Sequence, residues 1–296
     1  MDLGLPPPHL PRVVTGPRRS LFLAVESRTL SILLAAWLLV GQGGVVRAQG
    51  PIHEVVEGDV LDGHVGWGVA SAGDVDADGF ADYRVAAPFH SVGGQEVGAI
   101  GTFSGRDGSP ILIVVGTPGA NLGGVECIGD VDHDGTSDFA SNGGQPGLGV
   151  VIVFSGQAGT PLYTFSGHHV NDDFGDAMAG PGDVDGDGFV DLVVGAPQTV
   201  TAGGNHAGRV RVFSGFDGSV VHQLDGATGG QSLGEGVGSF GDFDADGHAD
   251  LVVGAPGDHG FATWAGAVRV VSGKTGTTLA TSYGAMAADY FGHACD

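Results

Sequence analysis

The sequence has 296 residues, of which 58 are glycine, 42% are hydrophobic and only 15% are charged. This length suits a single closed β architecture, and abundant glycine with few charges favours short strands and tight turns over long surface helices. The 34 acidic residues outnumber the 11 basic ones, which gives a formal net charge of −23. Such a chain repels phosphate-rich surfaces, so we expect no nucleic acid partner and no binding to anionic lipid.

Residues 1–48 have the pattern of a secretory signal peptide. Basic residues precede an apolar run from Leu30 to Val40, and Val46 and Ala48 stand at the positions that a signal peptidase reads. We therefore expect cleavage after Ala48 and a secreted or cell-surface mature chain. The alternative is an uncleaved anchor, but the apolar run is too short to span a bilayer. No later segment is long and apolar enough to be a membrane helix, so we expect no membrane span in the mature chain.

Two short motifs recur four times at a period of roughly 55 residues. The first is rich in aspartate, and its leading aspartates are 56, 53 and 59 residues apart. Its four copies are GDVDADGFAD at 73–82, GDVDHDGTSD at 129–138, GDVDGDGFVD at 182–191 and GDFDADGHAD at 241–250. The second motif is the end of an apolar strand followed by Ser-Gly, as TFSG at 102–105, VFSG at 153–156, VFSG at 212–215 and VVSG at 270–273.

Each period contains the pattern of four short strands. A strand leads into the aspartate loop, a buried run such as DLVVGAP follows it, and an alternating strand such as GRVRVFSG comes third. A tight turn then leads into the fourth strand. Four antiparallel strands per repeat predict an all-β fold, a β-propeller with about four complete blades and the start of a fifth. We place the propeller at residues 51–296, with units at 59–116, 117–170, 171–227 and 228–284 and a partial unit at 285–296.

The aspartate loops are candidate metal sites. Each has carboxylates at positions 1, 3, 5 and 9 and glycine at position 6, where the chain must bend sharply. Four carboxylates within nine residues repel one another unless a cation lies among them. The predicted ligands are Asp74, Asp76, Asp78 and Asp82; Asp130, Asp132, Asp134 and Asp138; Asp183, Asp185, Asp187 and Asp191; and Asp242, Asp244, Asp246 and Asp250.

Hard oxygen donors without histidine or cysteine select calcium over zinc or copper. We expect up to four Ca²⁺ ions, with the backbone carbonyl at position 7 as a further ligand. The loops are not EF-hands, because position 12 lacks glutamate and the flanking segments have the pattern of strands. The apolar residues at position 2 and after position 9 should point into the blade, which couples metal binding to core packing and makes the role of calcium structural. The position 2 residues are Val75, Val131, Val184 and Phe243.

The combined motifs resemble the FG-GAP repeats of the integrin α-subunit propeller. Phe174-Gly175 with Gly195-Ala196-Pro197 shows both halves of that motif, and Leu233-Gly234 with Gly254-Ala255-Pro256 repeats it. The first unit departs modestly from this two-part motif. In the second unit Asn142-Gly143-Gly144 replaces the second half, which leaves the second strand of that blade the least certain.

The resemblance implies calcium loops on one face of the propeller and partner binding on the opposite face. That face would carry the loops at 89–97, 198–207 and 257–265 together with the links between units. The segment from Tyr290 to Asp296 has the pattern of the opening of a fifth repeat. Because the resemblance implies seven blades, we expect an incomplete ring. The expected function is adhesion or ligand binding, with a protein or carbohydrate ligand on the face opposite the calcium loops, where Phe261 and Trp264 could anchor it.

The alternative function is enzymatic, as the propeller portion of a secreted hydrolase that resembles glycosylphosphatidylinositol phospholipase D. The sequence has no GxSxG and no HExxH motif. The one cluster of histidines with carboxylates is His168, His169, Asp172 and Asp173, which we interpret as a polar loop between blades. We therefore expect no catalytic residues and no enzyme activity.

Overall fold

The computed structural model describes residues 64–144 and 147–295, and these form strands and turns without a helix. The expected signal peptide at 1–48 lies outside the described residues, as does the segment 52–58. No helix within the described part is available to cross a membrane. The described residues belong to one compact unit.

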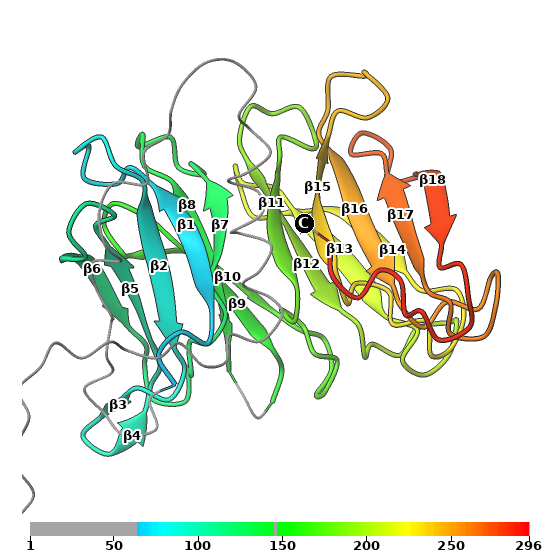
Figure 1. Ribbon diagram of the computed structural model, residues 1–296, viewed down its shortest axis with the longest axis horizontal. Coiled ribbons are helices and arrows are strands. Elements are labelled where there is room, and N and C mark those ends of the chain that lie inside the picture. The colour runs from blue at the N-terminus through cyan, green and yellow to red at the C-terminus, as the bar shows by residue number, and fades with distance from the viewer. Residues whose placement is uncertain (1–63, 145–146, 296) are drawn as a thin grey trace, which may run out of the picture. The chain divides into compact units, whose positions relative to one another are not determined.

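Four four-stranded antiparallel sheets make up this unit (Figure 1). Within each sheet the strands lie side by side in chain order, apart from a small hairpin of β3 (Ser91–Val92) and β4 (Gln95–Glu96) inserted in the first. The first sheet contains β1 (Val69–Gly73), β2 (Asp82–Ala87), β5 (Ala99–Phe103) and β6 (Pro110–Val115). The second contains β7 (Glu126–Gly129), β8 (Asp138–Gly143), β9 (Val150–Phe154) and β10 (Pro161–Ser166).

The third sheet contains β11 (Met178–Gly182), β12 (Asp191–Ala196), β13 (Arg209–Phe213) and β14 (Val220–Asp225). The fourth contains β15 (Val237–Gly241), β16 (Asp250–Ala255), β17 (Ala267–Val271) and β18 (Thr278–Tyr283). The first strands of neighbouring sheets, β1, β7, β11 and β15, contact one another in sequence. Sheets that follow one another with their first strands on the inside are the blades of a β-propeller, as the repeat predicts.

Each interface between blades is a separate apolar core. Side chains alternate along a strand, so successive residues of β12 face opposite neighbours. Leu192 and Val194 pack in the core shared with the second blade, whereas Val193 packs in the core shared with the fourth. All six residues of β12 are buried because blades cover both faces of this sheet.

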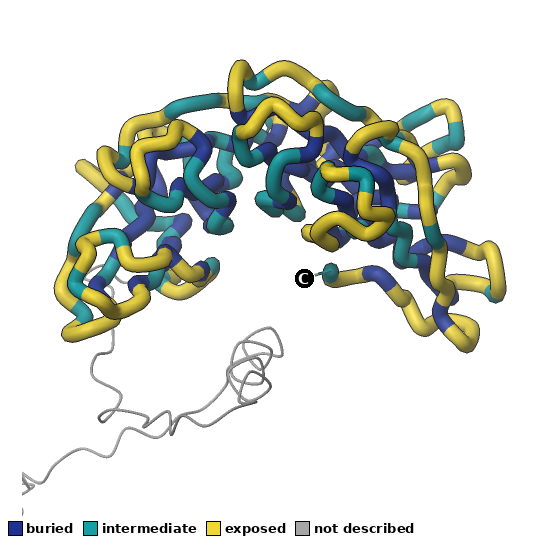
Figure 2. Tube along the Cα trace, turned by 90° about the horizontal axis from the view of Figure 1, so that it is seen from above, coloured by how far each residue is buried: buried dark blue, intermediate teal, exposed yellow. Residues whose placement is uncertain are grey.

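The blades follow one another in an open arc (Figure 2). No strand pairing joins the fourth sheet to the first among the described residues. Val252 of β16 is only partly buried, whereas the equivalent Val193 in the third blade is fully buried. The fourth sheet therefore has an outer face that no complete blade covers.

Residues 285–295 dock on the fourth blade as the opening of a repeat should. Phe291 forms a parallel bridge with Gly266, the same bridge that Leu122 forms with Gly98 and that Leu233 forms with Gly208. Leu122 and Leu233 are almost fully buried, whereas Phe291 is 43% exposed. The segment thus takes the place of the first turn of a fifth repeat.

The prediction for loop position 2 is wrong at Phe243. Val131 and Val184 are buried against the blade that follows their own, and Val75 is partly buried. Phe243 is 48% exposed, because the fourth blade has no complete blade after it among the described residues. The side chain at position 2 therefore packs between blades and not into its own blade.

Val184 and Phe243 give a matched pair of substitutions at one loop position. Val184→Ala should lower the free energy of unfolding by about 2 kcal/mol, because it removes two buried methyl groups and leaves a cavity. Phe243→Ala should change it by less than about 0.5 kcal/mol, because the ring is half exposed. Urea unfolding monitored by circular dichroism measures both, and equal effects would contradict packing of position 2 between blades.

Candidate metal centres

The four acidic loops connect the first and second strands of the four blades. Before each loop the ladder between these strands shifts register at a glycine, and that glycine then pairs with the aspartate at position 9. The four glycines, Gly73, Gly129, Gly182 and Gly241, have φ between 69° and 108°. This bulge turns the chain out of the sheet, so every loop leaves its blade at the same end and in the same way.

In each loop, three carboxylates gather so that one oxygen of each lies within 4.8 Å of the others. In the first and fourth loops these come from positions 1, 3 and 5, and in the second and third from positions 1, 3 and 9. The sets are Asp74, Asp76 and Asp78; Asp130, Asp132 and Asp138; Asp183, Asp185 and Asp191; and Asp242, Asp244 and Asp246. The structure thus brings together three of the four predicted ligands in every loop. The fourth, Asp82, Asp134, Asp187 or Asp250, lies outside the gathered set.

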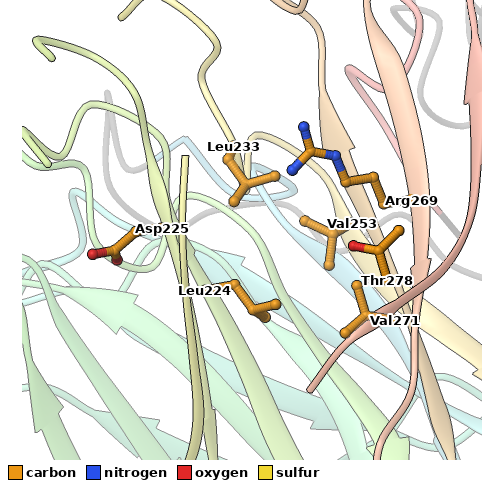
Figure 3. A pocket seen from close by; sticks show the side chains of 7 residues that line it. All are labelled: Leu224, Asp225, Leu233, Val253, Arg269, Val271 and Thr278. Atoms are coloured by element: carbon orange, nitrogen blue, oxygen red, sulfur yellow. The ribbon is translucent and has the colours of Figure 1, made fainter. Parts of the chain in front are cut away.

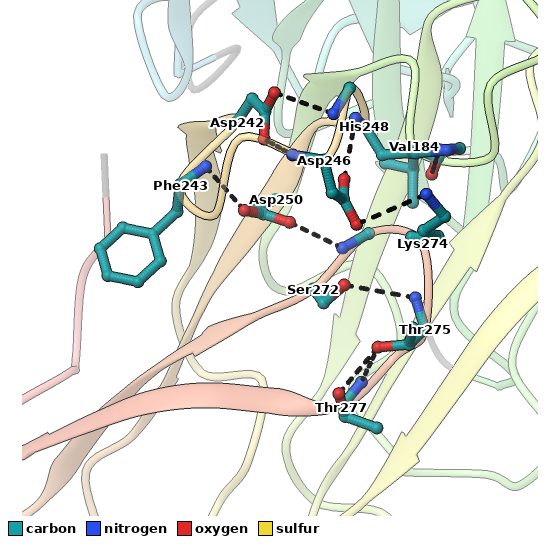
Figure 4. Close-up of polar contacts among 12 residues, drawn as sticks. Val184, Asp242, Phe243, Asp246, His248, Asp250, Ser272, Lys274, Thr275 and Thr277 are labelled. Carbon is teal, nitrogen blue, oxygen red and sulfur yellow. Dashed lines mark hydrogen bonds and ion pairs between the residues drawn. The ribbon is translucent and has the colours of Figure 1, made fainter.

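Backbone N–H groups of the loop itself hold the carboxylate at position 1. In the fourth loop, Asp242 accepts hydrogen bonds from the N–H of Asp246 at 3.0 Å and of Gly247 at 3.0 Å. The same two bonds occur in the other three loops at 2.9 to 3.1 Å. Position 5 accepts the N–H of position 7, as Asp246 does from His248 at 3.1 Å (Figure 4). The loop is therefore folded around its own carboxylates.

The aspartate at position 9 has a different role, which the sequence pattern did not reveal. In the fourth blade Asp250 accepts the N–H of Phe243 at 2.7 Å with one oxygen and that of Gly273 at 2.9 Å with the other (Figure 4). Gly273 is the last residue of the second recurring motif. Every blade repeats this pair, through Asp82 to Gly105, Asp138 to Gly156 and Asp191 to Gly215. Position 9 thus links the two recurring motifs to each other.

Burial and mutual repulsion disfavour the charged carboxylates. Burial raises the pKa of Asp138 and of Asp191 from 3.8 to about 6, against the opposing effect of the hydrogen bonds they accept. Burial and then the neighbouring carboxylates raise the pKa of Asp76, Asp185 and Asp244. A bound cation would relieve both effects. The donor set, oxygen only and three carboxylates within reach of one ion, fits calcium.

Two residues in each loop adopt the left-handed conformation. Glycine at position 6 has φ between 89° and 92° in all four loops, as the motif predicts. Position 4 is also left-handed, with φ of 58° at Ala77, 59° at His133, 82° at Gly186 and 61° at Ala245. No pattern in the sequence indicates the left-handed conformation at position 4, because only one of the four residues there is glycine.

Arg84 is a second residue that sequence reasoning missed. It occupies the place in β2 that Val193 occupies in β12, and it is completely buried between the first two blades. Its guanidinium lies over the ring of Phe139 at 4.6 Å and donates to the carbonyl of Ser137, position 8 of the second loop, at 2.6 Å. Burial lowers the pKa of this guanidinium. Arg84 therefore holds the second acidic loop from the neighbouring blade.

The cluster of histidines with carboxylates organises a loop between the second and third blades. Asp172 is buried and accepts the backbone N–H of His168 at 3.0 Å, His169 at 3.2 Å and Phe174 at 3.2 Å. Arg211 lies 3.1 Å from the Nε2 of His168, and this neighbouring charge lowers the pKa of His168. The carboxylate of Asp172 is thus engaged by the backbone, as in a polar loop that supports the fold.

A cavity of about 180 Å³ lies between the third and fourth blades (Figure 3). Leu224, Leu233, Val253 and Val271 form its apolar wall. The two charged residues at its edge both have partners elsewhere: Asp225 pairs with Arg209 at 2.6 Å, and Arg269 pairs with Asp258 at 3.1 Å. Thr278 completes the lining.

The comparison with family models matches the FG-GAP repeat at residues 174–213 and 237–271. The chain contains FG-GAP repeats. The matched segments run from Phe174 to the end of β13 and from β15 to the end of β17, so each includes an acidic loop. They are the two repeats in which both halves of the motif are complete.

Integrin α-subunits are similar to this chain at about 30% identity. Integrin alpha-E of Mus musculus is 33% identical over 157 residues, which cover 46% of this chain and 14% of that protein. Integrin alpha-V of Gallus gallus is 31% identical over 146 residues, with the same coverage of both chains. Integrin alpha-7 of Rattus norvegicus is 30% identical over 190 residues, 58% of this chain and 17% of that protein. The matched region thus spans less than a fifth of these relatives.

Two solved structures align over most of this chain at low similarity. Rhamnogalacturonan lyase YesW aligns with a TM-score of 0.46 at 17% identity, covering 71% of this chain and 41% of its own. Saccharomyces cerevisiae Sqt1 aligns with a TM-score of 0.45 at 11% identity, covering 72% and 47%. Similarity at this level supports no conclusion about the fold or function of FG-GAP repeats in this chain.

Without calcium, Asp138 and Asp191 should make the FG-GAP unit less stable as the pH rises. Their pKa of about 6 in the folded state exceeds the ordinary value of 3.8, so the folded state holds their protons more tightly than the unfolded state. The stability that these two protonated side chains add to the folded state is fully present below pH 3.8 and is lost as the pH rises through about 6. Urea unfolding in chelator at about pH 5 and pH 7 measures it.

The matched control for this pH effect is the double variant Asp138→Asn, Asp191→Asn, which cannot lose these protons. Its stability should depend less on pH between the same two values. In the unsubstituted protein, calcium affinity should fall below about pH 6, because protons compete for the same oxygens. If the free energy of unfolding depended on pH identically in the variant and the parent, Asp138 and Asp191 would not be the source of the pH effect.

Proposed function

We propose that this chain is a secreted or cell-surface calcium-binding β-propeller that acts in adhesion or ligand binding, with calcium in a structural role. The observation that carries the proposal is the repeated geometry of the acidic loops. In each, three carboxylates lie within reach of one ion, and the aspartate at position 9 joins the loop to the blade. An ion among them would fix the loop and, through position 9, the strands on both sides.

The proposed ions would be held by carboxylates at positions 1, 3, 5 and 9 together with the carbonyl at position 7. Calcium supplies positive charge and coordinates hard oxygen ligands with flexible geometry. Its proposed contribution is to stability, because the loop carboxylates otherwise repel one another and all four of those at position 9 are buried. The proposed sites contain no histidine or cysteine, which argues against zinc.

The proposed ligand, a protein or carbohydrate, would bind the face opposite the acidic loops. The strand order places the connections from second to third strands there, including residues 257–265. Phe261 is 68% exposed and Trp264 is 41% exposed. The Trp264 ring contacts His259 at 4.8 Å and Tyr290 at 6.1 Å between ring centroids. Exposed aromatic side chains held by their neighbours are typical anchors in binding interfaces.

Purified mature protein should take up calcium, with dissociation constants on the order of 10⁻⁴ to 10⁻³ M, as in extracellular modules. Calorimetric titration of folded, chelator-treated protein measures the number of sites and their affinity. Magnesium at the same concentration serves as the control, because it requires a smaller and more regular octahedral site. Folded protein that takes up no calcium would refute the proposed role.

The double variant Asp185→Ala, Asp187→Ala should destabilise the third blade by removing two ligands. Its melting temperature in calcium should fall to about that of the parent in chelator, and its melting should respond less to calcium. The matched control is Asp217→Ala, which removes a carboxylate from a turn of the same blade outside the acidic loop. An unchanged melting curve of the double variant in both calcium and chelator would contradict a structural role.

A further inference from the structure

The acidic loops of neighbouring blades touch one another directly. The residues at positions 7 and 8 of one loop lie against the beginning of the loop before it. In the fourth loop, Ala249 at position 8 donates its N–H to the carbonyl of Asp183 at 2.8 Å. The Nδ1 of His248, at position 7, lies 2.9 Å from the carbonyl of Val184. Because a carbonyl only accepts, His248 donates from Nδ1.

Of the two residues contacted in the third loop, Asp183 is a proposed ligand and Val184 donates its N–H to another. Asp183 is position 1, and its carboxylate is among the three that gather. Val184 donates its N–H to Asp191, the aspartate at position 9, at 2.7 Å. On the other side, the backbone N–H of His248 donates to Asp246, a carboxylate of the fourth loop. His248 therefore contacts a carboxylate of the fourth site with its backbone and, with its side chain, the residue that follows Asp183 in the third loop (Figure 4).

Gly186 makes room for this contact. A side chain at position 4 of the third loop would collide with the imidazole of His248, since a Cβ built on Gly186 lies 2.7 Å from its Cε1. The other three loops carry alanine or histidine at position 4. The loop that faces His248 is the one with glycine there.

The same positions meet between the second and third loops. His133, at position 4 of the second loop, stacks on Phe189, at position 7 of the third, with ring centroids 4.1 Å apart and planes within 6°. A Cβ added at Gly129, just before the second loop, would lie 3.3 Å from the side chain of Val190 at position 8. In both pairs of loops, the residue at position 7 of the following loop therefore lies against position 4 of the loop before it. The contact is ring stacking between the second and third loops, and an imidazole against glycine between the third and fourth.

We infer that the calcium sites of the second, third and fourth loops bind cooperatively, and that His248 is the positioning residue that couples the third and fourth. An ion in the fourth loop fixes position 5, which accepts the N–H of position 7, and positions 7 and 8 hold the backbone of positions 1 and 2 in the third loop. The next ion then orders fewer degrees of freedom and binds more tightly. This inference rests on the proposed calcium binding.

The experiment isolates two adjacent sites in the full mature chain. Asp76→Asn and Asp132→Asn disable the first and second loops at position 3. Adding Asp244→Asn leaves only the third site, and adding Asp185→Asn instead leaves only the fourth. Calcium titration by calorimetry of the pair and of both single-site proteins gives the coupling as a ratio of affinities. We expect calcium at one site to tighten the other by about 5-fold or more.

His248→Ala in the two-site protein should reduce that ratio to near 1, with the single-site affinities measured in the same variant as the reference. Gly186→Ala should reduce it in the same way, because it displaces the imidazole and removes no ligand. The matched control is His222→Ala. His222 also reaches a backbone carbonyl across the interface between the third and fourth blades, that of Gly273, but lies outside the loops. It should lower the melting temperature and leave the coupling ratio unchanged.

The outcomes separate this inference from the proposed function. Absence of calcium uptake by the unsubstituted protein would overturn the proposed function and the coupling with it. Calcium uptake with a coupling ratio of 1 in the two-site protein would overturn the coupling alone. A ratio that His248→Ala and His222→Ala reduce equally would show general destabilisation and would overturn the role of His248.

Discussion

The two hydrogen bonds of the aspartate at position 9 are the contact on which each blade depends. This carboxylate is the first residue of the second strand, and it holds the start of the acidic loop with one oxygen and the Ser-Gly turn after the third strand with the other. Three segments that are separate in the sequence therefore meet at one side chain. Because that side chain is buried and ionisable, its environment connects the packing of the blade to the charge state of the loop. The acidic loop is in this sense part of the core, although most of its side chains are exposed.

Much of the fold could be predicted from the sequence because its information is repeated. The period of the aspartate and Ser-Gly motifs located all four blades, and the alternation in segments such as 208–215 located strands. The hydrogen bond between the aspartate at position 9 and the glycine of the Ser-Gly motif, about 20 residues later, could not be predicted from the spacing of the motifs. A carboxylate in an acidic loop is interpreted as a metal ligand, so nothing pointed to this second role. The burial of this aspartate depends on the strand register, which no local pattern contains.

Departures from the repeat were the least predictable features. Asn142 stands where Gly195 stands in the third blade, and it left the second strand of the second blade in doubt. The structure forms that strand regularly, because the Asn142 side chain accepts the N–H of Gly124 and donates to the carbonyl of Gly175 at 2.8 Å. Arg84 replaces an apolar residue and is buried against Phe139. In both cases a polar side chain fills a position between blades and contacts the neighbouring blade. Phe243 shows the opposite case, because an apolar side chain at a position between blades stays exposed where no complete blade follows among the described residues.

The separation of the apolar cores has a consequence for how the chain loses its structure. Each core joins one pair of adjacent blades, so no single nucleus holds the whole unit, and the described part behaves as a short linear array. In such an array the cooperative units are local, and opening starts where a sheet has a neighbour on one side only. The residues of β12 and β13 are almost all buried, so their amide hydrogens should exchange slowly with solvent, whereas those of the mostly exposed β18 should exchange fast. Protection against exchange should therefore be highest in the interior blades and lowest in the outermost strands.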